Sequence, residues 1–147
     1  MRKIMALLLC SISILLLCAC TLNTPLKNKM LEYYTLDSNY VQVTGIIKSV
    51  EYHKEIDELY IKIEVSTDNH PFPYLGDDGC GEFTLVNWSL FEFDLEIGDA
   101  VVFTSAPYYF YNGHIWPIVA VEKEGCEYLS YEKGKDNYLN WIKETFA

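Results

Sequence analysis

The sequence has few basic residues, and no more than two of them are adjacent. Its 147 residues include 11 Lys and Arg against 21 Asp and Glu, for a formal net charge of −10. Proteins that bind nucleic acids usually carry a basic patch that neutralises phosphates, and anionic bilayer surfaces attract polybasic segments. The composition therefore excludes a nucleic-acid partner and recognition of a membrane surface through charge.

Motifs for metal binding and catalysis are also lacking. His53, His70 and His114 are far apart and do not form the pair, four residues apart on a helix, that binds zinc. The chain has no glycine-rich phosphate loop, no nucleophile elbow and no recognisable Cys and His pair. No metal or other cofactor is therefore expected, and catalysis has no support in the sequence.

The one long apolar run is too short to cross a bilayer. It extends from Ile4 to Ala19 without a charged residue and follows Arg2 and Lys3. A membrane-spanning helix needs about 20 apolar residues. A basic start followed by a shorter apolar run is typical of an export signal.

The run ends in Leu17-Cys18-Ala19-Cys20, which resembles the lipobox of bacterial lipoproteins. A lipobox has a leucine three places before the lipidated cysteine and a small residue directly before it. The resemblance implies that residues 1–19 are removed, that Cys20 carries acyl chains such as palmitate, and that the protein is a lipid-anchored membrane protein facing the extracytoplasmic side. Families more often have Ala, Ser or Thr where this chain has Cys18, and an uncleaved signal anchor is the alternative.

Cleavage would leave one small acidic domain. Loss of Arg2 and Lys3 leaves 9 basic residues against 21 acidic ones, a formal net charge of −12. We expect residues 20–24 to form a lipidated tether and residues 25–147 to form a single domain, since the remaining chain is too short for two cores. The acidity favours solubility, and a cationic or cell-wall partner is the alternative explanation.

Hydrophobic periodicity predicts a mainly β domain. Five strands are expected, at residues 41–50, 59–65, 82–86, 100–111 and 114–122. Asn112-Gly113 between the last two strands is a strong hairpin signal, because both residues tolerate the positive φ of a type I′ turn. Residues 66–81 are rich in Pro and Gly and predict a long loop.

Helical patterns are found at both ends of the domain. Thr24-Pro25 is typical of a helix start, and residues 25–34 have one apolar face. A second amphipathic helix is expected near the C-terminus, with Asp136 as its N-cap. Residues 87–98 are too apolar for a solvated loop and predict a helical turn that covers one end of the sheet.

This order of elements resembles the oligonucleotide/oligosaccharide-binding (OB) fold. The resemblance lies in Val41–Ile47, in Ile97–Phe103 and in Tyr111-Asn112-Gly113 followed by Pro117–Glu122, and it covers roughly residues 40–124. It implies a five-stranded Greek-key OB-like barrel with short N-terminal and C-terminal helices, in which Gly45 permits sharp coiling of the first strand. It carries over no functional residue, and the basic face of nucleic-acid-binding members is lacking.

Aromatic residues of the last hairpin are the best candidate site. Residues 108–111 and Trp116 place five rings where such barrels bring a loop to the ligand cleft. We therefore predict that Tyr60, Tyr109, Tyr111 and Trp116 bind a ligand by stacking on a sugar, a peptide side chain or a cation. The alternative is that these rings pair across the hairpin and stabilise it.

Two cysteines besides Cys20 remain after cleavage. Cys80 and Cys126 would form a disulfide if an exported domain of this size follows the usual pattern. Two free thiols are the alternative.

These observations predict a non-catalytic binding or assembly module of the cell envelope. Its ligand would be an envelope protein, a peptide or a glycan. One alternative is an interaction subunit of an envelope protein complex. Another is a small extracytoplasmic hydrolase or a hydrolase inhibitor.

Overall fold

The computed structural model describes residues 24–66, 71–73, 75–108 and 115–146. The six strands are β1 (Val41–His53), β2 (Glu58–Val65), β3 (Cys80–Val86), β4 (Ala100–Ser105), β5 (Ile115–Lys123) and β6 (Cys126–Leu129). The helices are α1 (24–35), α2 (Tyr131–Thr145) and the short 3-10 turns η1 (Asp37–Asn39) and η2 (Trp88–Leu90). The predicted mainly β fold class with a helix at each end is confirmed.

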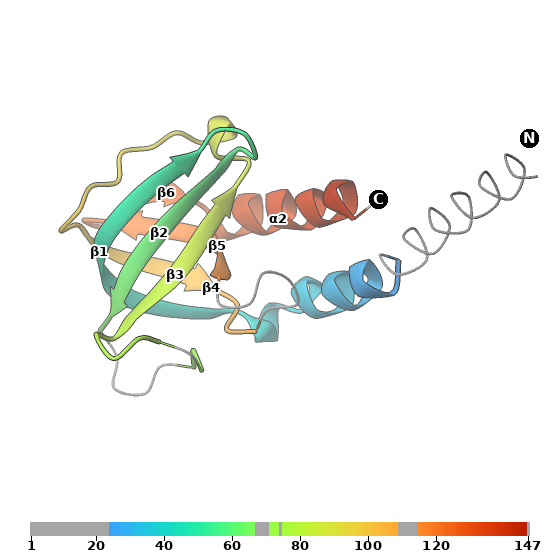
Figure 1. Cartoon of the computed structure of the whole chain (residues 1–147), viewed down its shortest axis with the longest axis horizontal. Helices are drawn as coiled ribbons and strands as arrows, with labels where there is room; N and C mark the ends of the chain where they lie inside the picture. Colours follow the sequence, from blue (N-terminus) through green and yellow to red (C-terminus); the bar gives the residue numbers. More distant parts are fainter. Residues whose placement is uncertain (1–23, 67–70, 74, 109–114, 147) are drawn as a thin grey trace, which may run out of the picture.

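Five strands close into a barrel. Their order is β3-β2-β1-β4-β5, and β3 then pairs with β5 to complete the ring (Figure 1). The closing pair is parallel, with Phe83 opposite Trp116, whereas every other neighbouring pair is antiparallel. This is the expected OB-like Greek-key arrangement.

The long first strand serves both halves of the barrel, and Gly45 lies where it passes from one to the other. This glycine is opposite Val65 of β2 and Val101 of β4. A Cβ atom there would lie 2.7 Å from the carbonyl oxygen of Glu64, too close for any other residue without movement. The position therefore requires glycine, as the resemblance implied.

The barrel core is aromatic at its centre and is covered at both ends. Phe83, Phe103 and Trp116 lie inside, no more than 1% exposed. Phe72, from the loop between β2 and β3, joins them. The segment around η2 packs four partly buried side chains against the core from one end of the barrel. They are Trp88, Phe91, Phe93 and Leu95. The predicted helical turn between the third and fourth strands is confirmed.

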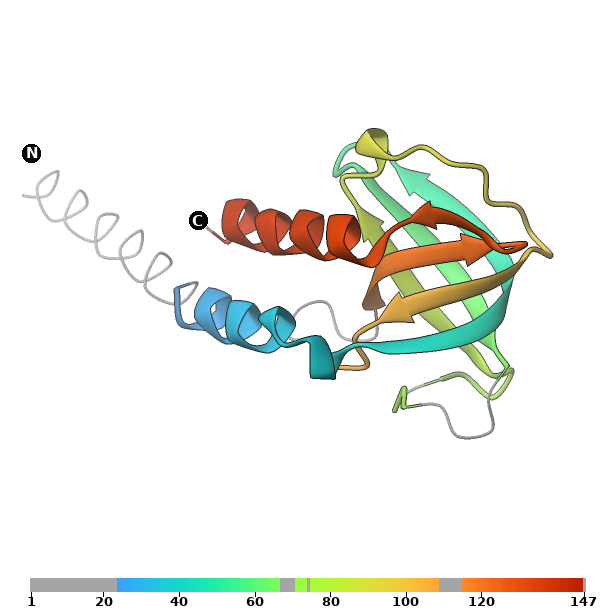
Figure 2. The same cartoon turned by 180° about the vertical axis from the view of Figure 1, so that it is seen from behind.

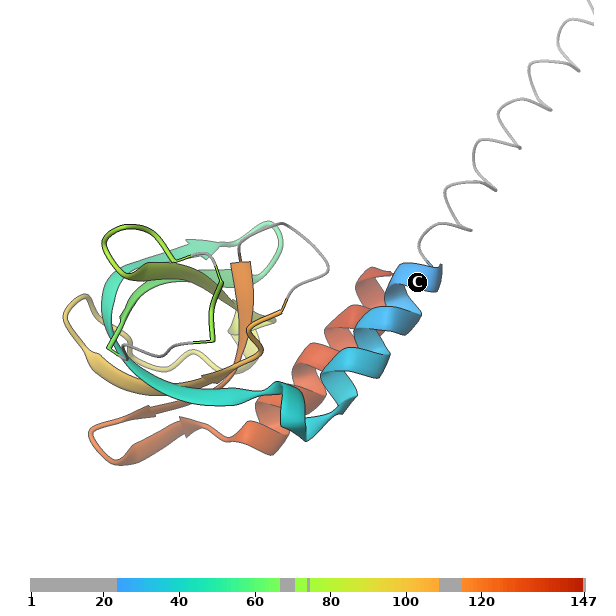
Figure 3. The same cartoon turned by 90° about the horizontal axis from the view of Figure 1, so that it is seen from below.

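A second apolar cluster joins both helices to the outside of the barrel. Met30 and Tyr34 of α1 pack with Tyr138 and Ile142 of α2 and with Val119 of β5. Figures 2 and 3 show the two helices side by side, extending together beyond the barrel. The chain enters through α1 toward the barrel and leaves through α2 away from it, so the helices are antiparallel.

The expected N-cap of the last helix was wrong, and one strand had not been expected. The last helix begins at Tyr131 after Ser130, so Asp136 lies inside the helix and is not its cap. Gly134, in the first turns of the helix, packs closely on β5. β6 is the strand that was not expected; it follows a turn in which both Glu124 and Gly125 have positive φ.

The hairpin of β4 and β5 is confirmed as an antiparallel pair, but its paired part is shorter than expected. β4 ends at Ser105, opposite Ile118, next to a bulge. Pro107 follows the end of β4, and Pro117 lies beside the bulge with its carbonyl accepting a 2.7 Å hydrogen bond from the Ser105 hydroxyl. The predicted turn at residues 112–113 lies outside the described residues.

Candidate functional site

The structure separates the four predicted ligand-binding residues. Tyr60 is half-buried on the outer face of β2, where it lines a cleft. Trp116 lies inside the barrel. Tyr109 and Tyr111 lie outside the described residues, as does Cys20. Binding by these two tyrosines stays a prediction.

Trp116 packs as a core residue. Its side chain is 0% exposed, and its ring centroid lies 5.0 Å from that of Phe72 and 5.5 Å from that of Phe83. In this orientation the ring offers no surface to a ligand outside the barrel. Trp116 therefore fits the alternative explanation, in which the hairpin aromatics stabilise the fold.

The two cysteines lie at distant points of the sheet and are free thiols. Cys80 begins β3, just before the segment that pairs with Ile115 at the start of β5. Cys126 pairs with Lys123 at the far end of β5 and is exposed. Burial raises the pKa of the Cys80 thiol, so it is a weak nucleophile.

A cleft lies where α2 crosses the outer face of the barrel. Its lining residues come from four elements: Glu58 and Tyr60 of β2, Thr84 of β3, Ile115 and Pro117 of β5, and Tyr138 and Trp141 of α2. Strand register explains the grouping, because Tyr60 is opposite Thr84 and Thr84 is opposite Pro117. The volume is about 30 Å³, comparable to one or two water molecules.

Glu58 is the buried carboxylate of this cleft. It points outward from β2 but is only 9% exposed, because α2 covers it. The Thr84 hydroxyl donates a hydrogen bond of 3.4 Å to its Oε2, and Tyr60 forms a second one. Within the described part of the chain, no Lys or Arg forms an ion pair with it. Burial raises its pKa, although these hydrogen bonds and nearby His53 act against that shift.

Tyrosine hydroxyls form a polar chain behind the cleft. The hydroxyl of Tyr138 is hydrogen-bonded to that of Tyr34, which donates to the carbonyl oxygen of Tyr108 at 2.9 Å. Burial raises the pKa of both hydroxyls well above its ordinary value, and the Glu58 charge adds to the shift at Tyr138. Both hydroxyls therefore remain protonated and act as hydrogen-bond donors.

Aromatic rings form one side of the cleft. The Trp141 ring is stacked on that of Tyr138, with centroids 5.5 Å apart and an angle of 12° between the planes. On the other side, the Tyr60 ring lies 4.3 Å from that of His53. These ring contacts hold the rings in place, so the cleft has firm walls.

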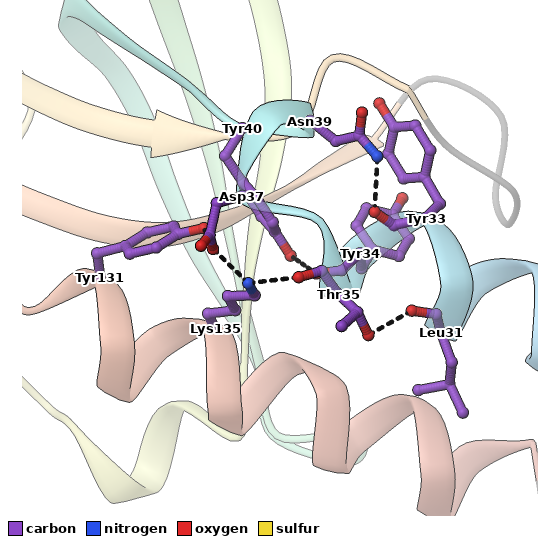
Figure 4. A network of polar contacts seen from close by, with 9 residues as sticks. All are labelled: Leu31, Tyr33, Tyr34, Thr35, Asp37, Asn39, Tyr40, Tyr131 and Lys135. Carbon is purple, nitrogen blue, oxygen red and sulfur yellow. Dashed lines mark hydrogen bonds and ion pairs between the residues drawn. The ribbon is translucent and has the colours of Figure 1, made fainter.

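A second polar network holds α1 against α2 at the barrel end of the helix pair (Figure 4). Lys135 donates to the carbonyl oxygen of Thr35 at 2.7 Å and forms an ion pair with Asp37. The Tyr131 hydroxyl donates to Asp37 at 2.7 Å. Lys135 and Tyr131 together lower the pKa of the Asp37 carboxyl. The charges of Lys135 and Asp37 neutralise each other, so we interpret this network as one that stabilises the helix pair.

A larger groove lies at the end of the barrel near the loop before β3. It has a volume of about 510 Å³ and includes Lys62, Leu75, Asp78 and Glu82. Lys62 and Asp78 form an ion pair of 3.0 Å across it. The described part of its lining is open, and its one lysine is already paired with Asp78, so it is a weaker candidate than the cleft.

The described residues contain no group of three or more His, Cys, Asp or Glu side chains placed to hold a metal ion. In that same part of the chain, no helix combines the length and the apolar character needed to cross a membrane. Glu58 is the one carboxyl group among the described lining residues of the cleft, whereas glycoside hydrolysis by the usual route requires two.

Sequence reasoning found one residue of the cleft, Tyr60, and missed the others. Glu58 and Thr84 alternate with core residues of their strands and therefore look solvent-exposed in the sequence. Only the path of α2 over this face buries them, and no local pattern encodes that path. The apolar face of the C-terminal helix was a signal that some outer face of the barrel would be covered.

In comparisons with known proteins, no family model, no curated protein and no solved structure matches this chain.

Proposed function

We propose that this chain is an extracytoplasmic lipoprotein, anchored by acyl chains on Cys20, whose barrel is a non-catalytic binding or assembly module. The observation that carries the proposal is the place where α1 begins. The blue N-terminal end of α1, four residues after Cys20, lies at the end of the helix pair remote from the barrel (Figure 1). An anchor at Cys20 would therefore hold the molecule by the helices and leave the barrel accessible.

The anchor is tested by metabolic labelling with an alkyne fatty acid in a bacterium that expresses the full chain. We expect label on the natural chain and none on Cys20→Ala. Cys18→Ala is the matched control, because it removes the neighbouring thiol and places a common lipobox residue there. Equal labelling of both variants would contradict the assignment of Cys20, and an unlabelled natural chain with residues 1–19 attached would contradict the anchor.

One observation favours the alternative of an interaction subunit. Tyr52, Ile56 and Leu90 are exposed apolar side chains, with exposed fractions of 43%, 52% and 67%. They lie around Asp57, whose carboxylate accepts hydrogen bonds from Tyr52 and from Ser89 next to Leu90. A photoreactive amino acid at Leu90 should crosslink to one defined membrane protein if this cluster is an interface, whereas the same group at exposed Glu124 should not.

A hydrolase is the other alternative, favoured by the raised pKa of Glu58 in a cleft, since a general acid needs such a carboxyl group. Glu58→Gln would abolish the activity of a hydrolase. A binding module would show no turnover to abolish.

A further inference from the structure

We propose that the cleft under α2 binds the terminal ammonium group of an unbranched alkylamine, with Glu58 as its counter-charge and the rings of Tyr60 and Trp141 beside it. The proposal rests on the proposed binding function and names the chemical class of ligand.

The shape of the cleft selects a small head on a narrow chain. Glu58, Pro117 and Tyr138 are buried and form its floor, while Tyr60 and Trp141 are half-buried and form its rim. A volume of about 30 Å³ admits an ammonium group and its first methylene. A sugar ring or a peptide backbone does not fit, and the compact ammonium group fits better than the planar guanidinium of arginine.

The charge at the floor selects a cation. Burying a carboxylate without a counter-charge is costly, and hydroxyl hydrogen bonds compensate for only part of that cost. The Thr84 contact is long, at 3.4 Å, so the carboxylate keeps acceptor capacity. An ammonium group supplies three donors and the missing charge.

The walls select an organic cation over a metal ion. Aromatic faces attract alkylammonium groups through their quadrupole and at the same time pack against methylenes. Hard metal ions require several oxygen ligands, and a single carboxylate is found among the lining residues described. The acidic surface of the whole chain attracts any cation toward the cleft.

Binding should depend on pH through Glu58. The groups that face it are His53 of β1, Tyr60 of β2, Thr84 of β3 and Tyr138 of α2. Burial raises the pKa of Tyr138, so its hydroxyl stays neutral, whereas Glu58 gains its charge as the pH rises. Affinity should therefore rise as Glu58 loses its proton and should vanish in acid.

The test uses the full-length lipoprotein in detergent micelles and follows tryptophan fluorescence and the NMR signals of the Trp141 indole. The probe is Nα-acetyl-lysine amide, and the uncharged isostere Nα-acetyl-norleucine amide is the control ligand. We expect saturable binding of the lysine derivative with a Kd on the order of 1 mM, as suits a single small group. The norleucine derivative should not bind.

Glu58→Gln should weaken binding of the lysine derivative by about 10- to 100-fold, because it removes a charge-assisted hydrogen bond and keeps the shape. Glu82→Gln, an exposed glutamate on the outer face of β3, is the matched control and should bind as the natural chain does. Unchanged affinity in Glu58→Gln, or equal binding of the norleucine derivative, would overturn the proposal. Trp141→Leu provides a second check, with weaker binding expected while Glu58 is intact.

Two sources of the amine are distinguished by a second probe, putrescine. Tighter binding of the lysine derivative indicates a peptide side chain, and tighter binding of putrescine indicates a free polyamine; either result supports the cleft as an amine site, and binding of neither overturns it. The proposed function is decided separately, since labelling at Cys20 does not depend on Glu58.

Discussion

Glu58 is ionisable and buried, so its effect on the free energy of unfolding should depend on pH. Its pKa is raised in the folded state, chiefly by burial. Below the pKa of the unfolded chain, near pH 4, the group is protonated in both states and costs nothing. As the pH rises through the pKa that Glu58 has in the folded protein, its carboxyl group becomes charged in a buried position. The folded protein then loses stability compared with a variant that has a neutral side chain there.

Glu58→Gln should therefore be as stable as the natural chain at about pH 4 and more stable at about pH 7. Urea denaturation at both pH values measures the two free energies of unfolding. Glu82→Gln is again the matched control, because its side chain is exposed. A stability gap that is equal at both pH values would show that the charge of Glu58 is not the cause.

Gly134 allows α2 to lie directly on β5. A Cβ atom at this position would overlap the carbonyl oxygen of Val119, and it would lie 2.6 Å from the carbonyl carbon of that residue. Alanine in an open helix is about 1 kcal/mol more favourable than glycine. We nevertheless expect Gly134→Ala to lower the free energy of unfolding by about 1–3 kcal/mol, because the helix must move away from the strand.

Chemical denaturation measures this loss, and Asp136→Ala in the same helix is the control. Asp136 is exposed and lies within α2, so its replacement should leave stability unchanged. A loss of about 1 kcal/mol in that variant would instead indicate a cap at Asp136.

At the scale of elements, a backbone carbonyl group near the C-terminal end of each long helix accepts a hydrogen bond from a lysine of the other helix. Lys135 of α2 donates to the Thr35 carbonyl at the end of α1, and Lys27 of α1 donates to the Lys143 carbonyl near the end of α2 at 2.9 Å. The last carbonyls of a helix lack partners and carry its negative dipole end, so a cation is favourable there. The two contacts hold the antiparallel helices together at both ends of the pair.

Lys135→Met should loosen α1 while leaving the barrel intact. Methionine keeps most of the apolar stem and removes the charge that binds Thr35 and Asp37, at a cost of about 1–2 kcal/mol. Hydrogen exchange should accelerate at the amides of residues 26–35 and stay unchanged in β2 and β3. Faster exchange throughout the chain would mean that the contact supports the whole fold and not α1 alone.

The elements themselves could largely be predicted from sequence, because alternation and capping are local signals. The regular alternation in Leu59–Val65 predicted β2, and Thr24-Pro25 predicted α1. β6 could not be predicted in this way, since its four residues form a strand only by pairing with the end of β5. The start of α2 was misplaced, because the helix begins after Ser130 and the Ser130 side chain makes no capping hydrogen bond.

At the scale of the whole molecule, the helix pair separates the N-terminal end of the described chain from the barrel. α1 rises about 18 Å at 1.5 Å per residue. Neutron reflectometry of the lipidated chain on a supported bilayer should therefore find a layer of low protein density, about 20 Å thick, between the headgroups and the barrel. Cys20→Ala should give no bound layer. Barrel density directly at the headgroups would mean that the helices lie flat on the bilayer.

The closed barrel could be inferred from the order of strands, but the cleft could not. Strand order reflects connections along the chain, which the sequence displays. The cleft depends on where the C-terminal helix meets the joint of β3 and β5, a contact between segments far apart in the chain. That contact turned Glu58 from an apparently solvated acid into a buried one.

The joint of β3 and β5 is short, with three residue pairs, and α2 covers it through contacts with Val86 and Val119. The closing strand β5 and the covering helix α2 both lie far from β3 along the chain. Closure of the ring therefore depends on a pairing of high sequence separation, and such pairings form slowly because the entropy of loop closure has to be offset first.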